Sequence, residues 1–329
     1  MADCDEVVIL SYSKPEAPGC EAHRRERWLA SSFPSAVRLV LDDARLARLQ
    51  LDGEFTTLPR NDDRASVHRR FVGMICRRVI GAEVNAVFTS ERYGDGFAAE
   101  LTADFRQRGR GTVVEHVAVD EARRAVPISG STIRADVHAN RHWLLPGVYP
   151  AFVRRICVLG GESSGKSTLA AALAESLGTA IVPEYGRELW ERRAGRLSFD
   201  DMLHIAETQV AAEDEAATRA HALLIGDTSP LTTLFYSRRL FGRADAALKR
   251  LADRRYDLTV LCAPDFPFVQ DGTRAGRRLR DEQHAWYLSQ LASRAVPWML
   301  ASGSVGDRVS EVRALLAGLH LVPETIERS

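Results

Sequence analysis

Short apolar runs alternate with segments of helical spacing along the whole chain. Before residue 140, four runs rich in β-forming residues predict strands at 6–12, 37–43, 86–90 and 113–120. Helical periodicity between them predicts helices at 21–33, 64–80 and 96–106. This alternation is typical of an α/β domain with a parallel sheet.

The pattern is interrupted at residues 144–154, which contain two prolines and a glycine. A second series then predicts strands at 156–159, 180–183, 222–227, 258–263 and 297–301. A helix should begin at Lys166 and end before Gly178, since glycine is common just beyond helix C-termini. Another helix should span 201–221. We therefore expect a first domain over 1–143, a linker over 144–154, and a second domain over 155–329 with helices on both faces of a parallel sheet.

Composition narrows the class of protein. With 44 basic and 44 acidic side chains, the chain has no net charge to attract nucleic acid or an anionic membrane. No apolar run approaches the roughly 20 residues that cross a bilayer, and the N-terminus is acidic where a signal peptide is basic. The five cysteines form no CxxC pair, which favours reduced thiols. We expect a cytoplasmic protein that binds neither nucleic acid nor membrane; the sequence leaves a homo-oligomer open.

The most specific motif is GGESSGKS at residues 160–167, which fits the phosphate-binding consensus GxxxxGK[ST]. An apolar strand precedes it and an Ala- and Leu-rich helix follows, which is the setting that this loop requires. Lys166 would reach the β- and γ-phosphates of ATP, and the Ser167 hydroxyl would bind Mg²⁺. The predicted ATP-binding residues are Gly160, Gly161, Glu162, Ser163, Ser164, Gly165, Lys166, Ser167 and Thr168.

Acidic residues end two of the strands expected in the second domain. Asp227 would hold Mg²⁺ or act as a base, as at the end of a Walker-B strand; otherwise it is the N-cap of the next helix. Glu184, Tyr185 and Arg187 follow another strand, and ligands gather at the carboxyl ends of parallel strands. We expect Glu184 to take the proton of an acceptor hydroxyl. Tyr185 and Arg187 would contact the acceptor, unless this segment is a surface turn.

Residues 271–280, DGTRAGRRLR, combine two glycines with four arginines. In a small kinase, such a segment suits a lid that closes over the triphosphate and neutralises charge during transfer. We predict that Arg274 and Arg277 act in catalysis and that Arg280 binds ATP, ahead of Arg278. The alternative is a solvated basic helix.

Four segments in order, GGESSGKS, EYGRE, IGDTSPLTT and QDGTR, resemble the ribosylnicotinamide kinase domain of the bacterial NadR family. In that family, a nicotinamide-nucleotide adenylyltransferase domain precedes the kinase domain, and both act in NAD salvage. The resemblance implies a P-loop kinase that uses ATP and Mg²⁺. It also implies nicotinamide riboside as the acceptor and nicotinamide mononucleotide as the product.

The first domain is similar to the adenylyltransferase half of the same family. ISGSTIR at 128–134 resembles the ISxTxxR signature; otherwise it is a capped helix start. In the signature, ATP phosphates would be bound by Ser129, Ser131, Thr132 and Arg134. The runs RRERWL at 24–29 and AVFTSE at 86–91 resemble further family segments.

One departure from the family concerns its opening strand and the GxFxPxHxGH segment that follows. None of the nine histidines lies in an HxGH pattern. We therefore expect an incomplete Rossmann-like nucleotidylyltransferase domain that is poor at adenylyl transfer. Two rivals to a kinase alone stay open: a full bifunctional enzyme whose upstream codons encode the missing segment, or a P-loop nucleotide sensor without phosphate transfer. The arginine-rich segment and Glu184 favour transfer over sensing.

Overall fold

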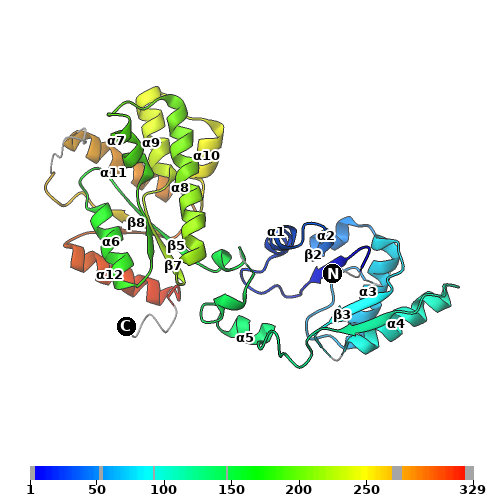
Figure 1. The fold of residues 1–329 in the computed structure, drawn as a ribbon. Helices are drawn as coiled ribbons and strands as arrows, with labels where there is room; N and C mark the ends of the chain where they lie inside the picture. The colour runs from blue at the N-terminus through cyan, green and yellow to red at the C-terminus, as the bar shows by residue number, and fades with distance from the viewer. Residues whose placement is uncertain (1–3, 52–54, 92, 146, 269–275, 323–329) are drawn as a thin grey trace. The chain divides into compact units, whose positions relative to one another are not determined.

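The computed structural model describes residues 4–51, 55–91, 93–145, 147–268 and 276–322. The chain forms two compact units, Met1–Val148 and Tyr149–Ser329 (Figure 1). The boundary lies inside the segment 144–154, where the alternating pattern of the sequence is interrupted by proline and glycine.

The second unit is built on a five-stranded sheet in which every pair of strands is parallel. Its strands are β5 (Arg154–Gly160), β6 (Ala180–Val182), β7 (Leu223–Asp227), β8 (Leu258–Cys262) and β9 (Trp298–Ala301), in the spatial order β6-β7-β5-β8-β9. Every residue of β7 and β8 is buried. This explains why those strands are continuous apolar runs in the sequence, since a parallel sheet is covered on both faces.

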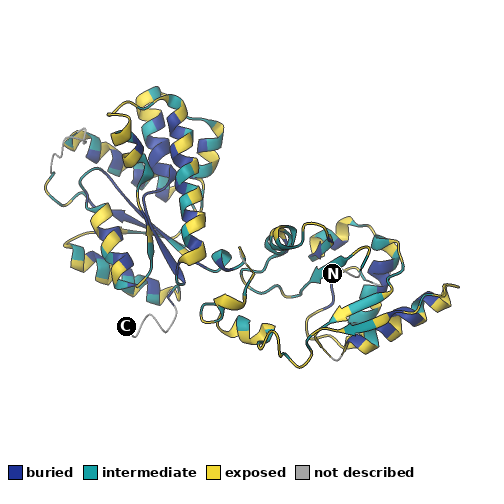
Figure 2. Ribbon diagram, in the orientation of Figure 1, coloured by how far each residue is buried: buried dark blue, intermediate teal, exposed yellow. Residues whose placement is uncertain are grey.

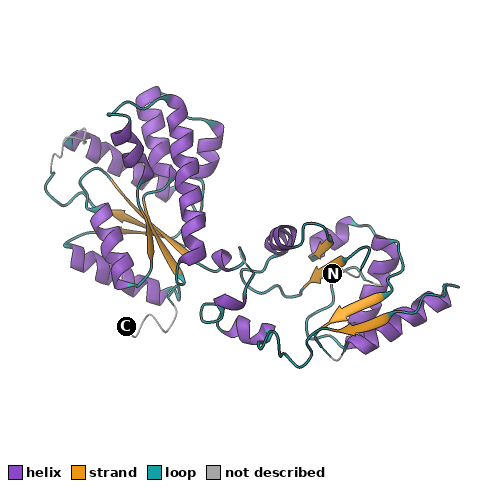
Figure 3. Ribbon diagram, viewed as in Figure 1, coloured by secondary structure: helices purple, strands orange, loops and turns teal. Residues whose placement is uncertain are grey.

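Helices cover both faces of this sheet (Figure 3). On one face, α6 (Lys166–Ser176) and α12 (Val305–Gly318) pack on alternate residues of β5, such as Ile156 and Val158. The opposite residues, Cys157 and Leu159, pack in the cluster of the other face. The helices of that face are α7 (Tyr185–Arg192), α8 (Phe199–Arg219), α9 (Pro230–Phe241), α10 (Ala246–Ala252) and α11 (Arg277–Ala292). The predicted fold class, a P-loop kinase-like α/β domain, is confirmed.

Most of the predicted elements of this unit are observed within one or two residues of their expected ends. The helix expected over 201–221 is α8, which begins earlier because Ser198 and Asp201 form a capping box. A second capping box, formed by Ser304 and Asp307, begins α12. Helices α7, α9, α10 and α12 were not predicted, and a helix at α11 was only the alternative to a lid.

The first unit contains four short strands: β1 (Val8–Tyr12), β2 (Val37–Leu41), β3 (Ala86–Thr89) and β4 (Glu115–Ala118). Where the sequence predicts one parallel sheet, the structure has two parallel pairs, β1-β2 and β3-β4. No described strand connects β1 to β3. The parallel sheet is thus interrupted at its middle, which agrees with an incomplete Rossmann-like domain.

The helices of the first unit are α1 (Ala22–Ser32), α2 (Asp43–Arg48), α3 (Ala65–Ile75), α4 (Gly94–Gln107) and α5 (Gly130–Ala135), with a π-helical turn, η1 (Cys76–Ile80), after α3. The helix expected over 64–80 is therefore α3 followed by η1. Phe71 and Met74 of α3 pack in a cluster with Leu41 of β2. Cys76 of η1 packs with Leu101 of α4, in a cluster that also includes Val87 of β3. One continuous helical segment thus supports both strand pairs.

Burial differs between the strands of the two units (Figure 2). No residue of β1, β3 or β4 is buried, whereas β5, β7 and β8 are buried over most or all of their length. The second unit therefore has the more complete core.

Candidate functional site

The glycine-rich loop connects β5 to α6 at the carboxyl end of the sheet. Ser163 and Gly165 adopt left-handed φ angles of 60° and 81°, so the backbone turns sharply before the helix begins at Lys166. Successive left-handed and right-handed residues direct N–H groups into one concavity, and α6 adds the positive end of a helix dipole. The loop therefore has the geometry of an anion-binding cradle.

Close packing explains the first two glycines of this loop. A Cβ atom on Gly160 would lie 2.2 Å from Ser164 Oγ, and one on Gly161 would lie 2.7 Å from the carbonyl oxygen of Arg280. Ser164 is fully buried. The loop is consequently held between its own buried serine and the first turn of α11, and no larger residue fits at either glycine.

The acid that ends β7 lies beside the loop, as predicted. Asp227 is in register with Val158 of β5, and the Ser167 hydroxyl is near enough to its carboxylate to lower the pKa of that group. Asp227 is buried, and its Oδ1 has no hydrogen-bond partner among the residues that the structure describes. Burial raises the pKa of this carboxyl above its ordinary value, against the opposing effects of Ser167 and Lys166. An unpartnered carboxylate oxygen beside a serine hydroxyl fits a Mg²⁺ site.

Glu184 lies at the same end of the sheet, between β6 and α7. Its Oε2 is 3.7 Å from Lys166 Nζ, and both side chains are largely buried. The charges of Glu184 and Arg187 also act on the carboxyl of Asp227. Four side chains singled out from the sequence therefore converge on one place, although they come from three separate segments. They are Lys166, Ser167, Glu184 and Asp227.

The residue after Glu184 is held by three partners. The Tyr185 N–H donates to Gln209 Oε1 at 3.0 Å, and Gln209 is buried on α8. The Tyr185 hydroxyl is hydrogen-bonded to His204 Nε2 at 3.1 Å and accepts from the Arg192 guanidinium at 2.9 Å. These contacts fix the start of α7, and with it the position of Glu184 at the edge of the cradle.

The arginine-rich segment is described only in part. Arg274 lies outside the described residues, with the whole of 269–275. Arg277 is the first residue of α11 and is exposed, as expected of a lid residue. Arg280 differs from expectation: it is buried, and its guanidinium donates to the Phe266 carbonyl oxygen at 2.8 Å. It lies behind the loop, against Gly161, because it occupies the buried face of α11.

Two further residues contact the loop and were not singled out from the sequence. Gln283 of α11 is buried and accepts a hydrogen bond from the Glu162 N–H at 2.9 Å. Tyr236 of α9 donates its hydroxyl to Glu162 Oε1 at 3.1 Å. Burial and the neighbouring Glu162 raise the pKa of Tyr236, which keeps it a hydrogen-bond donor. An isolated polar residue at a core position of a helix is the signal that would have found Gln283.

The phosphate motif predicted at residues 128–134 of the first unit differs in structure from the loop at 160–167. Ser129 is the N-cap of α5: its Oγ accepts from the Thr132 N–H at 3.0 Å and lies 2.8 Å from Thr132 Oγ1. Arg134 donates to Ser131 Oγ at 3.2 Å. None of the six residues of α5 is buried. The four predicted residues are therefore close together, but their polar groups bond to one another.

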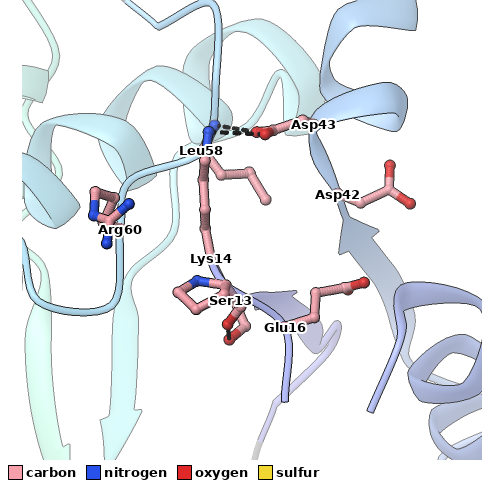
Figure 4. Close-up of a pocket in the computed structure, with 8 residues that line it drawn as sticks. Ser13, Lys14, Glu16, Asp42, Asp43, Leu58 and Arg60 are labelled. Atoms are coloured by element: carbon pink, nitrogen blue, oxygen red, sulfur yellow. Dashed lines mark hydrogen bonds and ion pairs between the residues drawn. The ribbon is translucent and has the colours of Figure 1, made fainter. Parts of the chain in front are cut away.

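The first unit also has a cavity of about 420 Å³ at the carboxyl ends of β1 and β2. Figure 4 shows Lys14 and the Leu58 backbone converging on Asp43, each at 2.8 Å. Glu16, on the same wall, is paired with Arg25 at 2.6 Å. The charges around this cavity are thus largely neutralised by partners within the chain. The residues that line it are Ser13, Lys14, Pro15, Glu16, Asp42, Asp43, Leu58 and Arg60.

The loop, the acid-ended neighbouring strand and the strand order define the second unit as a P-loop nucleotide-binding domain. In agreement, the family model of an AAA domain matches residues 155–308. No described helix is long and apolar enough to cross a membrane.

Comparison with known proteins gives a more particular relationship. The chain is 32% identical over 200 residues to the trifunctional NAD biosynthesis/regulator protein NadR of Escherichia coli (strain K12), covering 59% of this chain and 46% of that protein. It is 35% identical over 167 residues to the protein of the same name from Salmonella typhimurium (strain LT2), covering 49% of this chain and 41% of that protein. The chain is a homologue of the NadR proteins, and the matched region spans less than half of these two relatives.

Two crystal structures of NadR proteins share the fold over nearly the whole chain. One is a complex with NAD and AMP-PNP: its TM-score is 0.61 at 18% identity, and the match covers 94% of this chain and 86% of that one. The other is a complex with NR, with a TM-score of 0.59 at 18% identity over 95% of this chain and 88% of that one. The likeness therefore includes both units, each with its own fold.

Proposed function

We propose that residues 155–329 form a kinase that transfers the terminal phosphate of ATP to the 5′-hydroxyl of nicotinamide riboside, yielding nicotinamide mononucleotide for NAD salvage. The observation that carries this proposal is the convergence of Lys166, Ser167, Asp227 and Glu184 at the carboxyl end of one sheet. Homology to the NadR proteins, and an NR complex among structures of the same fold, support the choice of acceptor.

The loop and Lys166 bind and orient the triphosphate. The N–H groups at the start of α6 would bind phosphate oxygens, and Lys166 would supply a positive charge at the β- and γ-phosphates. Ser167 and the unpartnered Oδ1 of Asp227 would hold Mg²⁺. When bound, the metal neutralises charge that develops on the transferring phosphoryl group.

Glu184 is the base that we assign to the acceptor hydroxyl. The distance of 3.7 Å between its carboxylate and Lys166 Nζ supports this role, because Lys166 would bind the γ-phosphate. A lysine that bonds to phosphate oxygens leaves this carboxylate available for the hydroxyl proton. Tyr185 and Arg187, which follow Glu184 at the start of α7, are the residues that we assign to contacts with the riboside. Arg274 and Arg277 would then close over the phosphates and neutralise them during transfer.

A panel of nucleosides with labelled ATP tests the acceptor. We expect nicotinamide riboside to be phosphorylated far faster than uridine or adenosine. Equal rates on all three would leave a general nucleoside kinase, and ATP binding without transfer to any nucleoside would leave a nucleotide sensor.

Two variants, one just before α7 and one within it, test whether Glu184 is the base. Glu184→Gln should lower kcat by about 100-fold while leaving the KM for ATP nearly unchanged, because only proton removal is lost. Glu188→Gln is the matched control, since Glu188 is exposed on α7, one turn after Glu184, and pairs with Arg192 at 3.4 Å. An unchanged kcat for Glu184→Gln would contradict the assignment.

A further inference from the structure

An arginine occupies a core position of the last helix and reaches the back of the phosphate-binding loop. Arg308 lies in the first turn of α12 and is fully buried. Val312 and Leu316 follow at intervals of four residues on the same face, and both are fully buried in the apolar core. The sequence pattern thus calls for an apolar residue at 308, and the chain has a guanidinium there.

All three nitrogens of this guanidinium have partners. Nη1 donates to the Ser164 carbonyl oxygen at 2.8 Å. Nη2 donates to the Ala263 carbonyl oxygen at 3.1 Å and forms an ion pair with Asp265, and Nε donates to the Gly303 carbonyl oxygen at 3.1 Å. A buried charge is costly unless it is paired and hydrogen-bonded in this way.

The same partners join three separate loops at the carboxyl end of the sheet. Asp265 also accepts from the Gly303 N–H at 2.8 Å, so the loops after β8 and β9 are tied to each other. The ring of Phe266 stacks on the guanidinium with its centre 4.4 Å away. The same ring packs against Gly165, where a Cβ atom would lie 3.0 Å from it. The phosphate-binding loop is thus supported from behind by side chains that do not line the cradle.

The contact with Ser164 has a direct consequence for the loop. In a trans peptide unit the carbonyl oxygen and the following N–H point in opposite directions. Fixing the Ser164 oxygen on Arg308, behind the loop, therefore fixes the Gly165 N–H toward the cradle. Gly165 has a φ of 81°, and this left-handed conformation depends on the orientation of the same peptide unit.

We propose that Arg308 is a positioning residue for nucleotide binding: it orients the Ser164–Gly165 peptide so that its N–H is preset to bind a phosphate oxygen. This proposal rests on the proposed function only for the binding of ATP, not for the identity of the acceptor. Its partners in that role are Asp265, which orients the guanidinium, and Phe266, which fills the space behind Gly165.

ATP titration by calorimetry, with Mg²⁺ and without any acceptor, measures the effect. Arg308→Lys keeps the charge but cannot span the three carbonyl groups, so we expect the affinity of this variant for ATP to be about 10-fold lower. For Arg308→Ala, we expect an affinity about 100-fold lower. In kinase assays the KM for ATP should rise in both variants, whereas the KM for the riboside should stay unchanged.

The matched control is Arg313→Ala. Arg313 lies on the same helix and donates to the Ser176 carbonyl oxygen at 2.6 Å, at the far end of α6 from the loop. This variant removes the same kind of bond, from an α12 arginine to a backbone carbonyl oxygen, but at the end of α6 away from the loop. It should therefore cost stability while leaving ATP affinity within about two-fold. Equal loss of affinity in Arg313→Ala, or wild-type affinity in a folded Arg308→Lys, would overturn the proposal.

Asp265→Asn makes the test independent of whether Arg308→Ala folds. It weakens the ion pair but retains the arginine, and we expect a loss of ATP affinity smaller than that of Arg308→Lys. Wild-type affinity in both Asp265→Asn and Arg308→Lys would overturn the proposal. If the unaltered protein binds ATP but does not phosphorylate nicotinamide riboside, only the proposed acceptor fails; if it binds no ATP, both proposals fail.

Discussion

The chain carries two serine- and glycine-containing phosphate motifs, each before a helix, and the structure supports them in different ways. The loop at 160–167 follows a buried strand and is contacted by buried side chains of α11 and α12. The motif at 128–134 forms most of an exposed helix of six residues, and its side chains bond to one another.

The difference shows that a phosphate motif needs more than its own residues. In the second unit, polar groups of the loop are held by other elements, which leaves the N–H groups of the cradle available to a ligand. In the first unit, Ser129 and Thr132 satisfy each other, and no residue of α5 is buried. The first motif has the local structure of a helix cap, whereas the second is a site built by a whole domain.

The largest expected effect on activity comes from removing the lysine charge of the loop at 160–167. Lys166→Ala should lower kcat/KM for ATP by about 1,000-fold, because no other described side chain supplies a cation at the same place in the cradle. Circular dichroism and thermal unfolding should show a folded protein. Retained turnover would show that the loop does not act in transfer.

The next largest effect on activity is expected at Asp227, the carboxylate that we propose to bind Mg²⁺. Asp227→Asn should reduce activity by about 100-fold. The melting temperature should not fall, because the change removes a charge that is costly to bury. Residual activity should respond weakly to added Mg²⁺. A large drop in melting temperature together with full activity would show that Asp227 is structural.

A smaller effect, on stability, is expected when one glycine of each motif is changed to alanine. Gly161→Ala places a Cβ atom 2.7 Å from the backbone of Arg280, so we expect destabilisation by about 2 kcal/mol and a higher KM for ATP. Gly130→Ala meets only the flexible end of Arg134 at 3.3 Å, and its unfolding free energy should change by less than about 0.5 kcal/mol. Similar losses of unfolding free energy in both variants would contradict the difference in packing between the two motifs.

The smallest effect is expected at the exposed motif. Arg134→Ala should leave kinase activity unchanged, and the unaltered chain should form no NAD from nicotinamide mononucleotide and ATP. Chromatography with a sensitivity of one turnover per enzyme molecule checks the second point. Measurable NAD would mean that other groups replace the missing histidine pair of the adenylyltransferase family.

The sequence predicts the fold of the second unit well because its strands are continuous apolar runs and its loop has a strict consensus. The convergence of Lys166, Glu184 and Asp227 could also be predicted, since parallel strands present their carboxyl ends at one edge. The residues that support the site from behind, such as Gln209, Gln283 and Arg308, could not be located in this way, because no consensus marks them.

A pattern shared by those supporting residues would have revealed them. Gln209 continues the buried face of Met202 and Ile205 on α8, and Arg308 begins the buried face of α12. Gln283 lies with Tyr287 on the buried face of α11. Polar residues at core positions are costly without partners, so their presence in an apolar stripe indicates contacts with other elements. The partners themselves depend on the tertiary fold.

The buried cysteine behind the cradle provides a chemical reporter of the loop. Cys262 is fully buried on β8, in register with Gly160 at the start of the loop. Burial raises the pKa of its thiol to about 11, so the reactive thiolate is scarce at pH 7. We therefore expect alkylation of Cys262 only when the loop moves away from β8. A bound nucleotide that holds the loop should slow this alkylation, so the rate would report loop opening.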